Sequence, residues 1–259
     1  INGWIHINIF GTNIAFNLYA ATGNYQTISG YVLNVLPNFN ISSITSNYNG
    51  FEVSCNGAND GNISLIVPNS NLYTCNWMGP NGFLSNLFNI NNLFAGAYIY
   101  TITDTNGYSI TDSITLNEPQ NITINNSITN VFCYGGNDGQ VSLFISGGVS
   151  PYFENWFGNN PSSLSAGTYP YNVTDNNGCS INNSIILTEP TQISITEIVV
   201  DISCYGGTGG QASLLISGGT PPYVENWYGQ NPNNLTVGLF YYSIVDNNGC
   251  TVTDSVIID

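Results

Sequence analysis

The chain has 259 residues, with no Lys or Arg against 15 Asp and Glu, and a formal net charge of -15. Because nucleic acids and anionic membrane surfaces are bound through basic side chains, this composition excludes both as partners. Only 6% of the residues are charged while 42% are hydrophobic and 13% aromatic, which is typical of a folded protein and not of a disordered one.

The chain shows neither a membrane-spanning pattern nor a leader. No run approaches the roughly 20 apolar residues that cross a bilayer, so we expect no transmembrane segment in this fragment. The start of the sequence has no signal-peptide pattern, and residue 1 is Ile and not Met. We therefore expect an internal or processed fragment of a longer protein.

Prolines mark the expected module boundaries. Glu118-Pro119 and Glu189-Pro190 each follow the last strand pattern of a repeat, and Pro37 holds a similar place before the first repeat. They predict a divergent or partial β module followed by three complete modules, at residues 1–37, 38–119, 120–190 and 191–259.

The last two-thirds of the chain repeat with a period of 71 residues, the distance from Cys133 to Cys204. The Cys-Tyr-Gly-Gly that begins at Cys133 returns at Cys204, and the Asp-Asn-Asn-Gly-Cys of 175–179 returns at 246–250. A diverged copy opens at Cys55 and closes with Asp-Thr-Asn-Gly-Tyr, in which Tyr108 replaces the closing cysteine. Such internal periodicity predicts tandem modules.

Within each copy, short alternating runs such as 140–146 and 168–174 are separated by Gly, Asn and Pro. This is strand patterning, and no segment has a sustained helical period. Asn-Gly pairs at 106–107, 177–178 and 248–249 predict tight hairpins with positive φ angles. We predict an all-β chain of tandem immunoglobulin-like β-sandwich modules of about 70–80 residues, six or seven strands each, in an elongated array.

The six cysteines predict disulfides and hence an extracellular, oxidising setting. Cys133 and Cys179 have the same separation as Cys204 and Cys250, so we expect those two bonds within the second and third modules, with Cys55 bonded to Cys75 in the first. The chain has no Cys-x-x-Cys pair and a single histidine, so we do not expect a zinc site.

Three tryptophans and three aspartates recur at fixed places in the modules. Trp77, Trp156 and Trp227 are expected to fill the cores, although stacking on sugars is the alternative. Asp104, Asp175 and Asp246 are weak calcium candidates because hard cations prefer oxygen ligands, and capping of the hairpins is the preferred alternative. We expect no other metal and no cofactor.

Nothing in the sequence predicts an enzyme. His6 lies in the divergent first segment without a nucleophile–base pattern around it. Glu154 and Glu225 resemble glycosidase acids, but such enzymes need a second carboxylate nearby, and Cys75 holds the equivalent place in the first copy. These residues are expected to have structural roles.

The ordered motifs together resemble SprB-type repeats over about residues 51–259. These motifs are the Cys-Tyr-Gly-Gly-x-Asp-Gly opening, the Ser-Gly-Gly-x-x-Pro-Tyr centre, the tryptophan, the Ala-Gly-Thr-Tyr strand and the Asp-x-Asn-Gly-Cys close. The departures are Tyr108 in place of the closing cysteine and Gly209 where the other copies have Asp60 and Asp138. The resemblance implies a very large surface adhesin of gliding bacteria, exported by type IX secretion.

The resulting functional hypothesis is a cell-surface adhesin or filament fragment that mediates attachment, with a possible link to gliding. The alternative is a structural subunit of an extracellular fibre or sheath. Expected partners are neighbouring modules of the same chain, other copies in a filament, and surface polymers or glycans.

Overall fold

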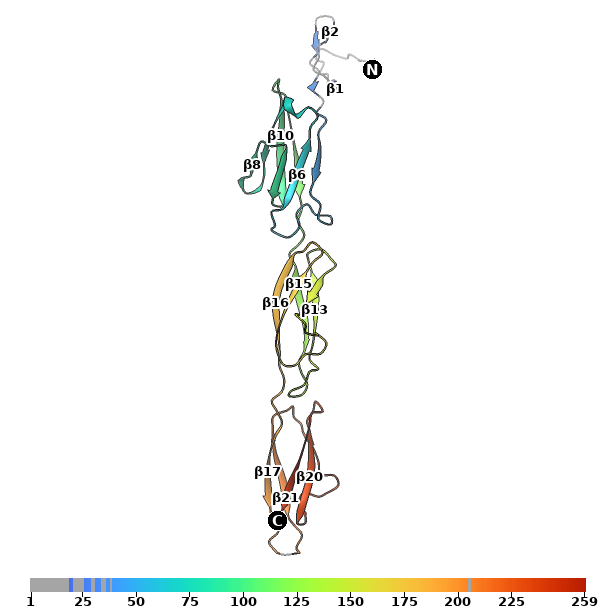
Figure 1. Cartoon of the computed structure of the whole chain (residues 1–259), viewed down its shortest axis with the longest axis vertical. Helices are drawn as coiled ribbons and strands as arrows, with labels where there is room; N and C mark the ends of the chain where they lie inside the picture. The colour runs from blue at the N-terminus through green and yellow to red at the C-terminus, as the bar shows by residue number, and fades with distance from the viewer. Residues whose placement is uncertain (1–18, 21–25, 29–30, 34–35, 38, 205) are drawn as a thin grey trace, which may run out of the picture. The chain divides into compact units, whose positions relative to one another are not determined.

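The computed structural model describes residues 39–204 and 206–259, together with four short strands before them (Figure 1). Those strands are β1 (Tyr19–Ala20), β2 (Gln26–Ile28), β3 (Tyr31–Leu33) and β4 (Leu36–Pro37). The expected module at 1–37 otherwise lies outside the described residues, as does His6. The chain divides into two compact units, Ile1–Asn121 and Ile122–Asp259.

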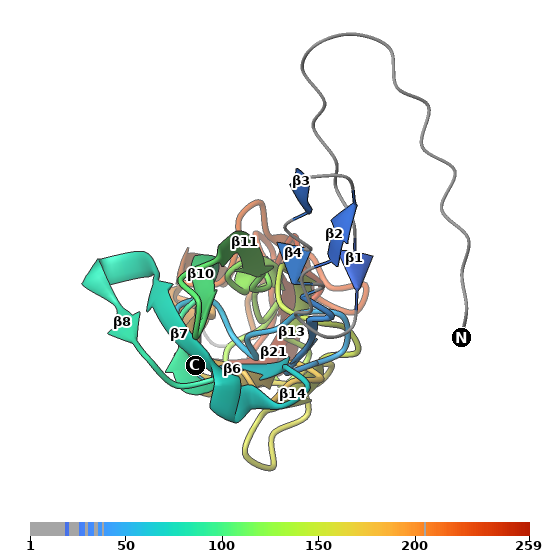
Figure 2. The same ribbon diagram turned by 90° about the horizontal axis from the view of Figure 1, so that it is seen from above.

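In the first unit, residues 39–121 form two antiparallel sheets. One has the strand order β11-β10-β7-β8 (Figure 2), and the other has the order β5-β6-β9. The strands are β5 (Ser42–Thr45), β6 (Gly61–Ile66), β7 (Tyr73–Met78), β8 (Leu84–Ser85), β9 (Asn89–Leu93), β10 (Gly96–Asp104) and β11 (Ser109–Leu116). Two single-turn 3₁₀ helices, Ser70–Leu72 and Pro80–Gly82, are the helical segments among the described residues.

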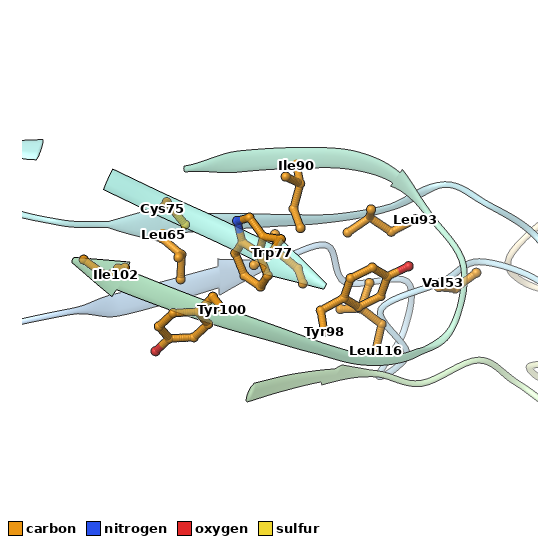
Figure 3. Close-up of a cluster of buried hydrophobic side chains, with 11 residues drawn as sticks. Val53, Leu65, Cys75, Trp77, Ile90, Leu93, Tyr98, Tyr100, Ile102 and Leu116 are labelled. Atoms are coloured by element: carbon orange, nitrogen blue, oxygen red, sulfur yellow. The ribbon is translucent and has the colours of Figure 1, made fainter. Parts of the chain in front are cut away.

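The core of this unit draws on both sheets. Trp77 is 1% exposed and its ring lies 5.2 Å from that of Tyr100 (Figure 3). Ile63 of β6 and Ile102 of β10 are fully buried in the same cluster. The alternation of buried and exposed residues along β6, β7 and β10 gives each strand one apolar face, and burial of those faces between the sheets stabilises the fold.

The second unit contains two hydrophobic clusters, one in each expected module. In the second module, β12 (Thr123–Thr129) pairs with β13 (Gln140–Ser146), and β14 (Phe153–Asn155), β15 (Gly167–Thr174) and β16 (Ser180–Leu187) form a second sheet. In the third module, the corresponding strands are β17 (Ser194–Val200), β18 (Gln211–Ser217), β19 (Val224–Asn226), β20 (Gly238–Val245) and β21 (Thr251–Ile258).

The all-β prediction is confirmed, but the strand number differs between modules. The first module has seven strands, whereas the second and third have five each in the part of the chain that the structure describes. The segment after Trp156 forms consecutive turns, with Asn159 N–H bonded to Trp156 O and Ser163 N–H bonded to Asn160 O. The first module instead has the strands β8 and β9 between its tryptophan and β10.

The predicted hairpins are present, but their turns are of a different type. In the first, Asp104 N–H donates to Tyr108 O and Gly107 N–H donates to Asp104 O. Gly107 has φ 86°, while Asn106 is not among the positive-φ residues. The loop is thus a type I turn followed by a left-handed glycine, so only the glycine needs the positive φ angle that we expected for the pair.

One buried tyrosine of the second unit lacks the partner that its equivalent has. Tyr242 is fully buried and its hydroxyl donates to Glu197 Oε1 at 2.6 Å. The equivalent Tyr171 is 1% exposed, and its hydroxyl has no hydrogen-bond partner. Asn126 stands where the third module has Glu197, so the acceptor is missing from the second module.

We expect opposite results from removing the two hydroxyls. Tyr242→Phe breaks a charge-assisted bond and should lower the free energy of unfolding by about 1–2 kcal/mol. Tyr171→Phe removes a buried, unpaired hydroxyl and should leave stability unchanged or raise it. Urea unfolding of the two variants measures both effects. Equal losses would contradict the assignment of Glu197 as the stabilising acceptor.

Candidate functional site

The closing hairpin of each module is organised by one aspartate. In the third module (closing hairpin Asp246–Cys250), Asp246 Oδ1 accepts the N–H groups of Asn248 and Cys250, both at 2.9 Å, and Oδ2 accepts that of Thr220 at 2.8 Å. Asp246 is 5% exposed. Burial raises the pKa of this carboxyl, but the backbone hydrogen bonds outweigh burial and hold the pKa below its usual value.

The same capping recurs in the other two modules. Asp175 accepts the N–H groups of Asn177 and Cys179 on Oδ1 and that of Val149 on Oδ2. Asp104 accepts the N–H groups of Asn106 and Tyr108 on Oδ1, while its Oδ2 accepts the side-chain amide of Asn106 at 3.5 Å. The three calcium candidates thus serve as hairpin caps, and no group of three or more potential metal ligands occurs among the described residues.

The opening turn of a module is held by the glutamate of its own Glu-Pro boundary. In the second module the turn comprises Cys133–Gly136, where Gly136 N–H donates to Cys133 O, and Glu189 Oε2 accepts Gly135 N–H at 2.6 Å. In the first module Glu118 Oε2 accepts Gly57 N–H at 2.6 Å. The junction glutamates therefore position the cysteine-bearing turns.

A disulfide joins the second module to the third. Cys133 of the opening turn bonds to Cys250 of the next closing hairpin, with Cα atoms 5.5 Å apart. Beside it, the Asn248 side chain donates from Nδ2 to Phe132 O at 3.0 Å. A pocket of about 380 Å³ at this junction is lined by residues of both modules, including Tyr134, Pro190 and Thr251.

The predicted pairings within modules are therefore wrong, and strand length gives the reason. Cys179 directly precedes β16, whereas Cys133 lies beside the far end of β16, where Val131 N–H donates to Thr188 O. Eight residues of strand span roughly 26 Å, but a disulfide needs Cα atoms less than about 7 Å apart. Cys179 is disulfide-bonded, but not to Cys133.

The other two predicted bonds are also absent. Cys204 is exposed and free, because Cys250 is bonded to Cys133. Cys75 is a free, buried thiol of the first core, and burial raises its pKa to about 11. Cys55 is disulfide-bonded, so the predicted bond between Cys55 and Cys75 is also wrong.

The tryptophans lie in the cores and are oriented by the glutamates two residues before them. Trp156 and Trp227 are each 6% exposed, and their Nε1–H groups donate to Glu154 and Glu225 at 3.0 and 3.1 Å. In the first module, where Cys75 replaces the glutamate, Trp77 donates to a backbone carbonyl instead. The two glutamates thus orient the tryptophans.

An aromatic side chain is exposed directly after Trp156 and directly after Trp227. Phe157 and Tyr228 are 58% and 57% exposed and have φ angles of 52° and 53°. A left-handed conformation is strained for a bulky residue, yet both modules place an aromatic there. Tyr228 also lines a groove of about 540 Å³ with Tyr241 and Leu239. The sequence does not predict the exposure of Phe157 and Tyr228, because their left-handed conformation is visible only in the backbone of the structure.

Comparison with protein families finds the SprB repeat at residues 125–154 and 196–230. The two matches lie in the second and third modules, and the SprB repeat suggests a cell-surface, gliding-associated protein family. No curated protein matches the chain. The disulfides are consistent with an extracellular location. Among the described residues no helix is long and apolar enough to cross a membrane.

Proposed function

We propose that this SprB-repeat chain is a fragment of a secreted cell-surface adhesin, built from immunoglobulin-like sandwich modules that make repeated weak contacts. The proposal rests on the exposed aromatic residues Phe157 and Tyr228, which occupy equivalent strained turns in two successive modules. Flat aromatic faces stack on sugars and apolar surfaces. Linked modules add such contacts, so useful attachment needs no single deep pocket.

The backbone around these aromatics fixes their display. Asn155 Oδ1 accepts Phe157 N–H and Asn226 Oδ1 accepts Tyr228 N–H, both at 2.9 Å. The turns are closed by Asn159 N–H to Trp156 O and by Gln230 N–H to Trp227 O. Each exposed ring therefore sits on a rigid base anchored by a buried tryptophan. This arrangement supports an attachment surface that repeats from module to module.

The test is attachment of beads that carry the chain to glass, polystyrene and polysaccharide-coated surfaces under flow. Phe157→Asn/Tyr228→Asn is expected to lower attachment about tenfold on the surface that binds the wild type best. The same variant should raise the free energy of unfolding by about 1 kcal/mol per site, because Asn tolerates the left-handed conformation better. Phe144→Asn, at another exposed aromatic, is the matched control. Unchanged attachment of the double variant would reject the proposal.

A structural fibre subunit is the second candidate. Leu239, Tyr241 and Ile257 are 50–63% exposed on the strand pair β20–β21, and such apolar surface favours association of modules from different chains. Electron microscopy of source cells, labelled with an antibody against residues 120–259, separates the two candidates. Thin single strands tethered to cells support the adhesin, while fibres with the modules at a fixed spacing support the polymer.

The proposed role is non-enzymatic and needs no cofactor. Glu154 and Glu225 bind tryptophan Nε1–H groups, and the aspartate caps accept backbone N–H groups, so these carboxylates already have structural partners. Hydrolysis of a glycan or peptide by the purified chain would overturn this part of the proposal.

A further inference from the structure

The third module repeats, at Cys204, the local structure that surrounds the bonded Cys133. Gly207 N–H donates to Cys204 O at 3.0 Å, as Gly136 N–H donates to Cys133 O at 2.9 Å. Ile202 N–H donates to Asp259 O at 3.0 Å, as Val131 N–H donates to Thr188 O at 3.1 Å. The opening turn of the third module is therefore fixed at the end of β21, as that of the second is fixed at the end of β16.

The capping side chains at this end also correspond. Asn130 Oδ1 accepts Thr188 N–H at 3.0 Å, and Asp201 Oδ1 accepts Asp259 N–H at 3.0 Å. Cys204 is nevertheless a free and exposed thiol, whereas the equivalent Cys133 holds the closing hairpin of the next module. Two equivalent turns thus differ in whether a partner hairpin is bonded to them.

The bond between Cys133 and Cys250 shows which kind of hairpin binds to an opening turn. Cys250 belongs to a hairpin whose backbone is fixed by Asp246, and Asn248 in the same hairpin donates to Phe132 O beside the bonded Cys133. The backbone carbonyl of Ser203 holds the position of Phe132 O in the third module. A hairpin with the sequence Asp-Asn-Asn-Gly-Cys therefore provides both the thiol and the amide donor for this turn.

The positions of the opening turn and the closing hairpin within a module indicate which module supplies the hairpin for Cys204. The opening turn lies at the end of the module where the chain leaves it. The closing hairpin lies at the opposite end, where the chain enters the module, because Thr220 N–H donates to Asp246 and the adjacent Gly219 N–H donates to Thr191 O. The opening turn of one module therefore meets the closing hairpin of the next module in the chain. We propose that Cys204 is the covalent attachment site for the closing hairpin of an SprB-type module joined after residue 259.

The bond forms by oxidation of two thiols. The Cys204 thiol and the hairpin thiol each lose a proton and together give up two electrons. A disulfide oxidant such as oxidised glutathione accepts both electrons and both protons and leaves as two glutathione thiols. Because the two modules are tethered, their effective concentration is in the millimolar range, and that favours this pair over contacts between chains.

The test extends the full chain by a second copy of residues 189–259 in which the opening cysteine is replaced by Ser, so that the peptide of Cys204 occurs once as a thiol. The protein is refolded in a glutathione redox buffer and mapped by mass spectrometry without reductant. Cys204 is expected to bond to the closing cysteine of the added module, and its alkylation should fall from near-complete in the original chain to near zero. Replacing the closing cysteine of the added module with Ser should restore alkylation. A Cys204 that stays alkylated, bonds to a second chain, or bonds to any other cysteine of the chain overturns the proposal.

A second variant tests the geometric premise without an added module. Cys133→Ser releases Cys250 in the original chain, where β21 separates Cys250 from Cys204 by roughly 26 Å. Both thiols are expected to be alkylated in the folded protein. A bond between Cys204 and Cys250 of one chain would show that the turn accepts its own hairpin, and the proposal would then fail.

Discussion

Asp246→Asn is expected to lower the free energy of unfolding of the third module by about 3 kcal/mol, since it disrupts charge-assisted hydrogen bonds in a buried site. The carboxylate accepts three backbone N–H groups at 2.8–2.9 Å and is 5% exposed. An amide has one oxygen, so its NH₂ group must face one of those donors. The hairpin or the loop at Thr220 then loses its anchor.

The effect of Asp246 should also depend on pH. The hydrogen-bonded carboxyl has a pKa below the usual value of 3.8, so the folded state binds this proton less readily than the unfolded chain. Its stabilising contribution is therefore complete above the unfolded pKa and is lost as pH falls through the lower, folded pKa. Wild type and Asp246→Asn should converge in stability at strongly acid pH.

The measurement is urea unfolding followed by tryptophan fluorescence between pH 7 and pH 2. Asp254→Asn is the matched control, because it removes one charge from the same module at an exposed site. This control matters in a chain with a net charge of -15, where any loss of an acidic group relieves repulsion. Equal stability of the two variants at pH 7 would refute the capping argument. Asp175→Asn should reproduce the loss in the second module.

Removing the disulfide between the second and third modules should lower the free energy of unfolding by at least as much as Asp246→Asn. Cys133→Ser is expected to lower the free energy of unfolding of the second unit by about 5 kcal/mol, since the bond spans 117 residues and constrains the unfolded chain. The modules should nonetheless stay folded, because Trp156 and Trp227 belong to separate hydrophobic clusters. Their near-ultraviolet circular dichroism should persist.

Denaturant unfolding with and without reductant measures this loss. Cys204→Ser is the control, because Cys204 is exposed and unbonded, and it should leave the unfolding midpoint unchanged. A variant Cys133→Ser as stable as wild type would show that the bond adds nothing to folding. Peptide mapping that joins Cys133 to Cys179 would contradict the structure directly.

Much of the local structure could be predicted from the sequence. Period-two alternation gave the strands, and each Asp-x-Asn-Gly pattern gave a hairpin, since these signals depend on neighbouring residues. The strand number was right for the first module but too high for the second and third, because the polar, Pro-containing segment after Trp156 forms turns.

The cysteine pairing could not be obtained from repeat spacing. Equal separations are compatible with bonds within modules and with bonds between them. The deciding quantity is the length of β16, which places Cys179 and Cys133 at opposite ends of a module. The closing cysteine immediately precedes the last strand of its module, and the Glu-Pro boundary immediately follows that strand. The length of the predicted strand could therefore have shown that the closing cysteine lies far from the end of its module. The strained turns at Phe157 and Tyr228 left no such signal.

The Cys133–Cys250 bond also changes how the chain carries tension. The bond holds the two ends of a 117-residue segment together, with the Cα atoms of Cys133 and Cys250 5.5 Å apart. Force that pulls these two residues apart is carried by the sulfur atoms and not by the backbone between them. Fully stretched, that segment would span about 400 Å. While the bond is intact, Cys133 and Cys250 therefore cannot separate even when the enclosed modules unfold, and a local reductant becomes the signal that releases this length.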